Sequence, residues 1–427
     1  MNFYLPRVVE SLLAEALANV PAIFIEGPKG VGKTATAKRF AKTVFELDNP
    51  VAREALAGNL GSLAKLPRPV LVDEWQFLPD VWNKVRRLVD DGAPKGSFIL
   101  TGSVSKMDQN LHSGAGRILS IRMRPFSLQE RFGNASRVSI AALLDQKKPF
   151  SKKLEGEVKA TYEDYVGEIV RSGLPGIRGA DAAHARNLLN DYARYAVTHD
   201  FAAQGVNVRS PNTLMRWLKS YAAAVATDAG YGAILDASTG GEADKPARNT
   251  TASYREALER LWLIDELPAW LDGGDWLSRL KLTPRHHLAD PALVCALLGI
   301  GKNDLLMGRA TSVFERKNKT FAGRLFESLV AQSMKVFAEA CEASVSFLRT
   351  RNGDHEVDLI IQRGRRVLAF EVKIAPTVSD DDVKHLLWLR EKLGADLVDA
   401  AVITTGPYCY RRQTDKIGVI PAAMLGP

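Results

Sequence analysis

The stretch Gly27-Pro28-Lys29-Gly30-Val31-Gly32-Lys33-Thr34 decides the fold of the N-terminal part of the chain. It follows the apolar run Ala22 to Glu26, a predicted buried strand, and precedes a segment with helical periodicity. A glycine-rich loop in this context, ending in Gly-Lys-Thr, is typical of a phosphate-binding P-loop. Its backbone N–H groups can wrap the phosphates, and the N-terminal end of the helix favours negative charge. We therefore expect the loop to bind ATP, with Lys33 at the β- and γ-phosphates and Thr34 on Mg²⁺.

Two further predicted strands end in residues that suit ATP hydrolysis. Val70 to Asp73 is apolar up to its carboxylate, and we expect Asp73 to hold Mg²⁺ through water while Glu74 orients the attacking water. The strand Phe98 to Thr101 leads into Ser103, which we prefer over Thr101 as the hydroxyl that senses the γ-phosphate. Arg117 is a candidate for a charge-stabilising arginine finger, although an ordinary surface arginine explains its position more simply.

Strands alternate with helical patterns throughout this first part of the chain. Helical periodicity runs from Ala35 to Phe45 and from Asp80 to Asp90, and Ile118 to Met123 is a further predicted strand. This alternation indicates an α/β fold, a parallel sheet with helices on both faces. We expect residues 1–150 to form a P-loop ATPase domain of the AAA+ type.

Residues 151–305 have a different, mostly helical character and are predicted to be a helical lid followed by a winged helix-turn-helix. Ser210-Pro211 starts one helix, and Ser253 to Glu256 is a predicted capping box that opens another. Leu263 to Leu271 and Leu280 to Leu288 flank a glycine-rich turn and are expected to form the hairpin wing, although a helical lid with a stray hairpin fits the pattern equally well. In the winged-helix interpretation this region binds duplex DNA, with phosphate contacts from Arg248, Arg255 and Arg260.

Residues 306–427 are predicted to be a second α/β domain with the element order α-β-β-β-α-β. The expected elements are a helix from Phe321 to Phe337, strands from Ser344 to Arg349, Glu356 to Gln362 and Arg366 to Ile374, a helix from Asp380 to Leu393, and a strand from Leu397 to Thr404.

Carboxylates in this last region suggest a metal site. Asp358 and Glu371 lie on strands joined by a tight turn, and Glu327 on the preceding helix could complete a ligand set for Mg²⁺ or Mn²⁺. Lys373, two residues after Glu371, points to the same face of its strand and could position water or steady charge. Carboxylates, a metal and a lysine are the groups of a metal-assisted phosphodiesterase. The alternative is that these residues are ordinary charged positions on edge strands.

Composition restricts the partners. A net charge of +8 favours anionic partners, and DNA is the expected one beside ATP. No segment approaches the roughly 18–20 apolar residues that cross a bilayer, and the first residues do not resemble a signal peptide, so we expect a cytoplasmic protein without a membrane partner. Three widely separated cysteines fit a reducing compartment. The sequence leaves a homo-oligomer open.

These motifs together resemble a known family, the bacterial and archaeal AAA+-type ATPases in which an AAA domain is followed by a DUF4143 region. The resemblance implies ATP binding, with Arg7 among the nucleotide-site residues, a winged helix in the middle and a PD-(D/E)xK nuclease-like fold at the C-terminal end. A stretch around Ala222 to Asn249 departs from the pattern like an insertion. The matching segments are Tyr4-Leu5-Pro6-Arg7, Ile25-Glu26-Gly27-Pro28, Leu71-Val72-Asp73-Glu74, Ile99-Leu100-Thr101-Gly102-Ser103, Gly116-Arg117, Arg124-Pro125-Phe126-Ser127, Gly323-Arg324-Leu325-Phe326-Glu327, Arg349-Thr350-Arg351, Glu356-Val357-Asp358 and Glu371-Val372-Lys373.

Two functions of different class follow. The first is an ATPase whose nucleotide state controls a DNA-directed, metal-dependent nuclease-like domain, for which the set Asp358, Glu371 and Lys373 argues. The second is an ATP-dependent regulatory switch that binds DNA or a protein partner without cleaving nucleic acid. The absence of a second acidic cluster in the sequence favours this second function.

Overall fold

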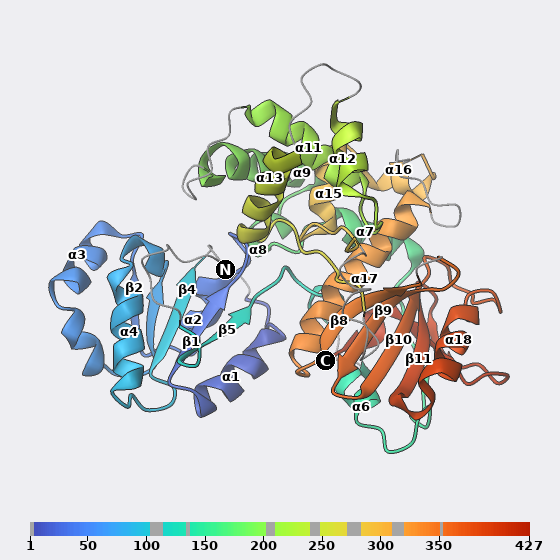
Figure 1. The fold of residues 1–427 in the computed structure, drawn as a ribbon, viewed down its shortest axis with the longest axis horizontal. Helices are drawn as coiled ribbons and strands as arrows, with labels where there is room; N and C mark the ends of the chain where they lie inside the picture. The colour runs from blue at the N-terminus through green and yellow to red at the C-terminus, as the bar shows by residue number, and fades with distance from the viewer. Residues whose placement is uncertain are drawn as a thin grey trace. The chain divides into compact units, whose positions relative to one another are not determined.

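The computed structural model describes residues 4–102, 114–133, 137–201, 210–239, 248–270, 283–309, 320–350 and 353–427. The chain divides into two compact units. The first unit comprises Met1–Arg124 together with Leu174–Gly176 and Leu258–Leu263. The second comprises Pro125–Gly173, Ile177–Ala257 and Ile264–Pro427 (Figure 1).

The first unit is built on a five-stranded parallel sheet in the order β2-β3-β4-β1-β5. Alternate residues of its strands, such as Phe24, Val72 and Leu100, pack into one core with Trp82 of α4. The residues between them face the other side, because side chains alternate along a strand. The predicted parallel α/β sheet is confirmed. Its elements are α1 Val9–Asn19, β1 Ala22–Glu26, α2 Lys33–Lys38, β2 Thr43–Glu46, α3 Pro50–Gly58, η1 Leu60–Ala64, β3 Val70–Asp73, η2 Trp75–Phe77, α4 Asp80–Asp90, β4 Phe98–Gly102 and β5 Ile118–Arg122.

The helix expected from Ala35 to Phe45 is wrong in its second half. The helix α2 ends at Lys38, and Thr43–Glu46 forms the edge strand β2, paired in parallel with β3. The run Thr43-Val44-Phe45 consists of β-branched and aromatic residues, which suit a strand better than a helix. Half-buried and exposed residues alternate along β2, as expected of a strand at the edge of a sheet.

The second unit begins with short elements and then a group of helices, most of which lie together near the top of Figure 1. Ser210 caps α11 by accepting a hydrogen bond from the N–H of Thr213, so the predicted helix start is confirmed. Ser253 is no cap, because α13 already begins at Arg248. The elements are α5 Leu128–Phe132, β6 Val138–Ser139, α6 Ile140–Leu144, β7 Gly156–Glu157, α7 Tyr162–Val170, α8 Pro175–Arg178 at the boundary with the first unit, α9 Ala182–Tyr195, a π-helical turn Ala196–Asp200, α11 Pro211–Ala223, α12 Tyr231–Thr239, α13 Arg248–Arg260, whose last turn belongs to the first unit, α15 Pro291–Leu298 and α16 Lys302–Leu306.

A mixed seven-stranded sheet in the order β7-β12-β13-β11-β10-β9-β8 completes the second unit. Its central strands β9, β10 and β11 match the predicted strands closely, and β12 and β13 extend the sheet beyond them. The buried helix α17 contacts β8, β9 and β10. The elements are α17 Phe321–Glu339, β8 Ser344–Arg349, β9 Glu356–Arg363, β10 Arg366–Val372, α18 Lys384–Leu393, η4 Gly394–Asp396, β11 Leu397–Thr404, β12 Tyr408–Arg411, β13 Gly418–Pro421, η5 Ala422–Met424 and β14 Leu425–Gly426.

The segment expected to form a wing belongs to this sheet. Its two arms do meet, at the antiparallel bridges Ile264 to Leu288 and Leu267 to Arg285. The first arm then continues to a parallel bridge between Ala269 and Phe347, which adds it to the edge strand β8. The turn at residues 271–282 lies outside the described residues. A boundary at 305/306 therefore cuts through one continuous packing unit, because the arm and β8 share backbone hydrogen bonds.

Side chains also join the arm to α17 within the second unit. Lys335 forms an ion pair with Asp265 at 3.0 Å, and Ser328 and His287 lie within hydrogen-bond distance at 3.0 Å. All four side chains are buried. Within the part of the chain that the structure describes, no helix combines the length and apolarity that a bilayer span requires.

Candidate active site

The loop between β1 and α2 has the conformation that its glycines permit. Gly27, Gly30 and Gly32 all have positive φ angles, of 148°, 72° and 101°. A Cβ atom at Gly27 would lie 2.2 Å from the carbonyl oxygen of Met123, so only glycine fits there. Gly32 is the N-terminal cap of α2 in a left-handed conformation. The backbone can therefore curl tightly in front of the helix, which is the shape that a phosphate cradle needs.

Lys33 points into this curl. Its Nζ donates hydrogen bonds to the carbonyl oxygens of Gly27, at 2.9 Å, and Pro28, at 3.0 Å. Burial lowers the pKa of Lys33 to about 8, against the opposing attraction of Glu74 and Asp73. A buried ammonium group beside two carboxylates and surrounded by loop backbone is well placed to bind phosphate oxygens.

Asp73 links the P-loop helix to the central strands. Its carboxylate accepts hydrogen bonds from Thr34 Oγ1, at 2.8 and 2.9 Å, and from the hydroxyl of Thr101. The side chain of Asp73 is 5% exposed. The structure thus brings together the two predicted Mg²⁺-binding residues, Thr34 and Asp73, and adds Thr101, whereas the sequence analysis prefers Ser103 as the hydroxyl near the γ-phosphate.

Glu74 follows β3 in a strained backbone conformation. Its φ angle of 52° is left-handed, which is uncommon for a residue with a side chain and typical of functional sites. The amide of Gln76 donates a hydrogen bond to one carboxylate oxygen of Glu74. This contact orients the carboxylate that is predicted to position water. The spacing Glu74-x-Gln76 in the sequence does not predict the contact by itself, because the contact depends on the turn η2.

The remaining predicted residues of the first unit have different surroundings. Arg7 is buried, and its guanidinium donates to the carbonyl oxygens of Val31, at 2.9 Å, and Arg124, at 2.6 Å. These two contacts support the backbone at Val31 in the P-loop and at Arg124. Arg117 is exposed and forms an ion pair with Asp90 at 2.8 Å. The hydrogen bond from Arg117 lowers the pKa of Asp90. Ser103 lies outside the described residues.

This set of residues fits ATP with Mg²⁺. The loop conformation excludes a side chain at Gly27, where a close backbone turn is needed. The donor set consists of loop amides and the buried Lys33, and the oxygen ligands would be Thr34 and Asp73. Bound Mg²⁺ supplies charge neutralisation at the phosphates. The cation of Lys33, the hydroxyl of Thr34 and the carboxylate of Glu74 lie beyond the carboxyl ends of the strands β1 and β3.

The predicted C-terminal metal site contains an arginine that the sequence interpretation missed. The guanidinium of Arg285 contacts Glu327, Glu356 and Asp358, the last at 3.1 Å. Arg285 is fully buried, and Glu327 and Asp358 are each 1% exposed. Burial alone would lower the pKa of Arg285, but the attraction of the three carboxylates raises it instead. The guanidinium therefore supplies the positive charge that the sequence predicts to come from a metal ion.

The other two residues predicted for this site, Glu371 and Lys373, are not among the ion-pair partners of Arg285. Asp358 also accepts a hydrogen bond from the N–H of Val372, at 2.9 Å, which places it beside the end of β10, where the buried Glu371 lies. Lys373 pairs instead with Asp382 at 3.2 Å. Among the described residues, no group of three or more histidine, cysteine, aspartate or glutamate side chains is arranged to hold a metal ion. Glu327, Asp358 and Glu371 therefore do not fit Mg²⁺ or Mn²⁺ in this arrangement.

Three family models match parts of the chain. Residues 19–132 match a model described as an AAA domain, and residues 322–425 match a domain of unknown function, DUF4143. Residues 162–304, most of the helical region, match a second domain of unknown function, DUF8612. The chain thus contains an AAA domain, which carries the P-loop, and a C-terminal DUF4143 region.

Similar proteins have been recorded in mycobacteria and among solved structures. The uncharacterized proteins Rv2008c of Mycobacterium tuberculosis and Mb2031c of Mycobacterium bovis are each 24% identical over 382 residues, 87% of this chain and 75% of theirs. The Walker-type ATPase PABY2304 of Pyrococcus abyssi has a TM-score of 0.40 at 16% identity, covering 69% of this chain and 96% of its own. Protein VC1899 from Vibrio cholerae has a TM-score of 0.20 at 13% identity, covering 97% of this chain and 91% of its own. Scores this low do not establish a shared fold.

Proposed function

We propose that Glu74 is the carboxylate that orients the attacking water in ATP hydrolysis, while Lys33 binds the phosphates and Thr34 and Asp73 hold Mg²⁺. The observation that carries this assignment is the contact of Asp73 with both Thr34 and Thr101, next to a strained Glu74. The hydrogen bond from Gln76 supports it, because a water-orienting carboxylate needs a fixed direction.

Two variants test the assignment. Glu74→Gln should retain ATP binding and lose hydrolysis, because the substitution keeps the shape and removes the charge that orients water. Lys33→Ala should lose binding, because phosphate charge then stays uncompensated. Nucleotide binding by calorimetry and phosphate release measure the two effects separately. Hydrolysis by Glu74→Gln at the rate of the unsubstituted protein would refute the role of Glu74.

We further propose that ATP binding and hydrolysis switch the affinity of the second unit for a partner, and that this unit does not cut nucleic acid. The buried contact of Arg285 with Glu327 and Asp358 supports this function over the nuclease-like one, because the guanidinium already neutralises these carboxylates. The net charge of +8 supports DNA as the partner. A homo-oligomer stays a prediction that light scattering with and without ATP can test.

The partner and the absence of cleavage can be tested together. Fluorescence anisotropy with labelled duplex DNA at low salt, with and without ATP, should give binding that weakens as salt rises, because lysines and arginines displace condensed counterions. Plasmid incubated with the protein, ATP and Mg²⁺ or Mn²⁺ should stay intact. Cleavage that Asp358→Ala abolishes would restore the nuclease-like function, and failure to bind any duplex would leave a protein partner.

A further inference from the structure

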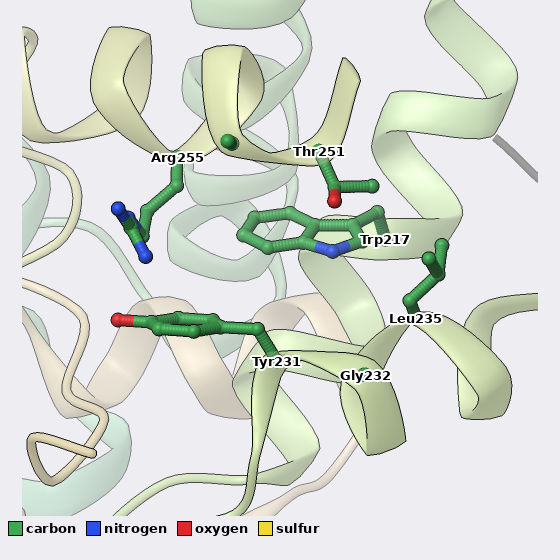
Figure 2. Close-up of a pocket in the computed structure, with 7 residues that line it drawn as sticks. Trp217, Tyr231, Gly232, Leu235, Thr251 and Arg255 are labelled. Atoms are coloured by element: carbon green, nitrogen blue, oxygen red, sulfur yellow. The ribbon is translucent and has the colours of Figure 1, made fainter. Parts of the chain in front are cut away.

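A cavity of about 340 Å³ lies in the helical part of the second unit. Its size falls within the range of small-molecule sites, which begins at about 300 Å³. Three helices line it (Figure 2): α11 through Trp217, α12 through Tyr231, Gly232 and Leu235, and α13 through Thr251 and Arg255.

The wall contributed by Trp217 carries a hydrogen-bond donor that the described protein atoms leave unused. The side chain is 1% exposed, and its Nε1 has no hydrogen-bond partner among the residues that the structure describes. Figure 2 shows the nitrogen-bearing edge of the indole turned toward Gly232 and Leu235 across the cavity. A buried N–H without an acceptor is unfavourable, so at a cavity wall it calls for an acceptor from a molecule inside the cavity, either water or a ligand that displaces it.

The opposite wall is held rigidly. The guanidinium of Arg255 lies over the ring of Tyr231, 4.4 Å from its centroid. The hydroxyl of Tyr231 donates to both oxygens of Glu266, at 2.7 and 2.9 Å, and Glu266 also accepts from Tyr221 at 2.8 Å. Tyr221 in turn packs against the indole of Trp217, with ring centroids 5.4 Å apart. Both aromatic walls are thus fixed by one network, and a site that is rigid before binding loses less entropy on binding.

We propose that this cavity binds a small planar aromatic molecule that carries a hydrogen-bond acceptor, either a carboxylate or a ring carbonyl. The indole N–H and the guanidinium can only donate, so the ligand must provide the acceptors. Flat rings at Trp217 and Tyr231, with Leu235 beside them, favour a flat apolar body. None of these residues belongs to the nucleotide site, so the inference stands or falls separately from the proposed function.

Binding to the full-length protein can be measured by calorimetry and ligand-observed NMR with three probes. Indole-3-acetate presents a carboxylate, quinolin-2-one presents a neutral ring carbonyl, and 3-methylindole presents no such acceptor. We expect one of the first two to bind about tenfold more tightly than 3-methylindole, about the worth of one hydrogen bond. Which of the two binds identifies the acceptor class.

Two variants outside the nucleotide site assign the binding to this cavity. Trp217→Phe removes the N–H and keeps an aromatic wall, so it should weaken binding of the acceptor probe about tenfold. Gly232→Leu should fill the cavity and abolish binding, because a Cβ at Gly232 meets no heavy atom within 4 Å. Both variants should hydrolyse ATP at the unsubstituted rate. Absence of binding at millimolar probe, equal binding of 3-methylindole, or binding that survives Gly232→Leu would each refute the proposal.

Discussion

Lys33 is buried and is proposed to bind the phosphates of ATP, so its protonation state should affect the affinity for ATP. Burial disfavours the ammonium form and lowers its pKa from the ordinary value to about 8. Bound phosphate would favour the ammonium form and raise the pKa again. Above pH 8 the protein without nucleotide therefore holds a largely neutral Lys33, and ATP binding must take up a proton.

The affinity for ATP should accordingly be constant below about pH 8 and fall as pH rises above it, approaching tenfold per pH unit. Calorimetry between pH 7 and about 10 in two buffers of different ionisation enthalpy measures both the affinity and the proton uptake. Lys29→Ala is a matched test, because Lys29 is a like charge that helps to lower the pKa of Lys33. The fall should then begin at a higher pH. A flat affinity across this range would contradict the account.

Arg285 and Arg117 offer a comparison of two arginines in opposite surroundings. Arg285→Met leaves Glu327 and Asp358 buried without their counter-charge, and breaking a buried pair in this way costs about 3–5 kcal/mol of folding free energy. Arg117→Met breaks an exposed ion pair with Asp90, which solvent screens, so the free energy of unfolding should change little. Urea unfolding should separate the two variants clearly. An Arg285→Met variant as stable as Arg117→Met would mean that the buried carboxylates do not depend on the guanidinium.

At the scale of elements, Ser210 gives a direct test of a helix that lines the small-molecule cavity. Its hydroxyl accepts from the N–H of Thr213 at 3.3 Å and from the hydroxyl of Thr213 at 2.9 Å. Ser210→Ala should lower the free energy of unfolding by about 1 kcal/mol, whereas Ser210→Asp should preserve it, because aspartate caps equally well. Thermal unfolding of the three proteins measures this. Equal destabilisation by both substitutions would argue against capping.

Elements with a strong local signal could be predicted from the sequence. The predicted bounds of the strands β1, β3, β8 and β11 agree with those in the structure, because apolar runs bounded by glycine, proline or charge specify them locally. The strand β2 was missed because its apolar side chains continue the helical pattern before it. The start of α13 was misplaced because Ser253 and Glu256 have capping-box spacing inside a helix that begins earlier.

The two candidate sites also differ in how much local sequence signal specifies them. The P-loop, Asp73 and Glu74 lie in short motifs whose residues determine their own geometry, so the sequence alone could predict that Thr34 and Asp73 lie together. Arg285 meets Glu327 and Asp358 only through tertiary packing, and no spacing in the sequence relates an arginine to carboxylates that far along the chain. Two of the three predicted carboxylates, Glu327 and Asp358, do converge, but on an arginine that no local motif marks.

At the scale of the whole molecule, the DUF4143 region depends on residues that precede it. Arg285 balances its buried carboxylates, and Gln146 donates a hydrogen bond to Asp399 at 2.9 Å. We expect a fragment of residues 306–427 to lack cooperative unfolding, and a fragment of residues 125–427 to unfold in a cooperative transition. Circular dichroism melts and amide NMR dispersion compare them. A shorter fragment with sharp melting and dispersed signals would show that the expected boundary near residue 306 is a real domain boundary.

The contact between Gln146 and Asp399 spans 253 residues, and this has a consequence for how the protein is made. At a synthesis rate of about 5–20 residues per second, Gln146 is synthesised on the order of 10 to 50 seconds before its partner exists. The P-loop sheet can assemble during that interval, since its five strands are complete by Arg122. The second unit must wait, with the edges of β6 and β7 exposed, and Arg285, once made, waits for Asp358. Slow translation or premature termination late in the message would therefore expose the second unit to chaperones and proteases while the P-loop sheet is already assembled.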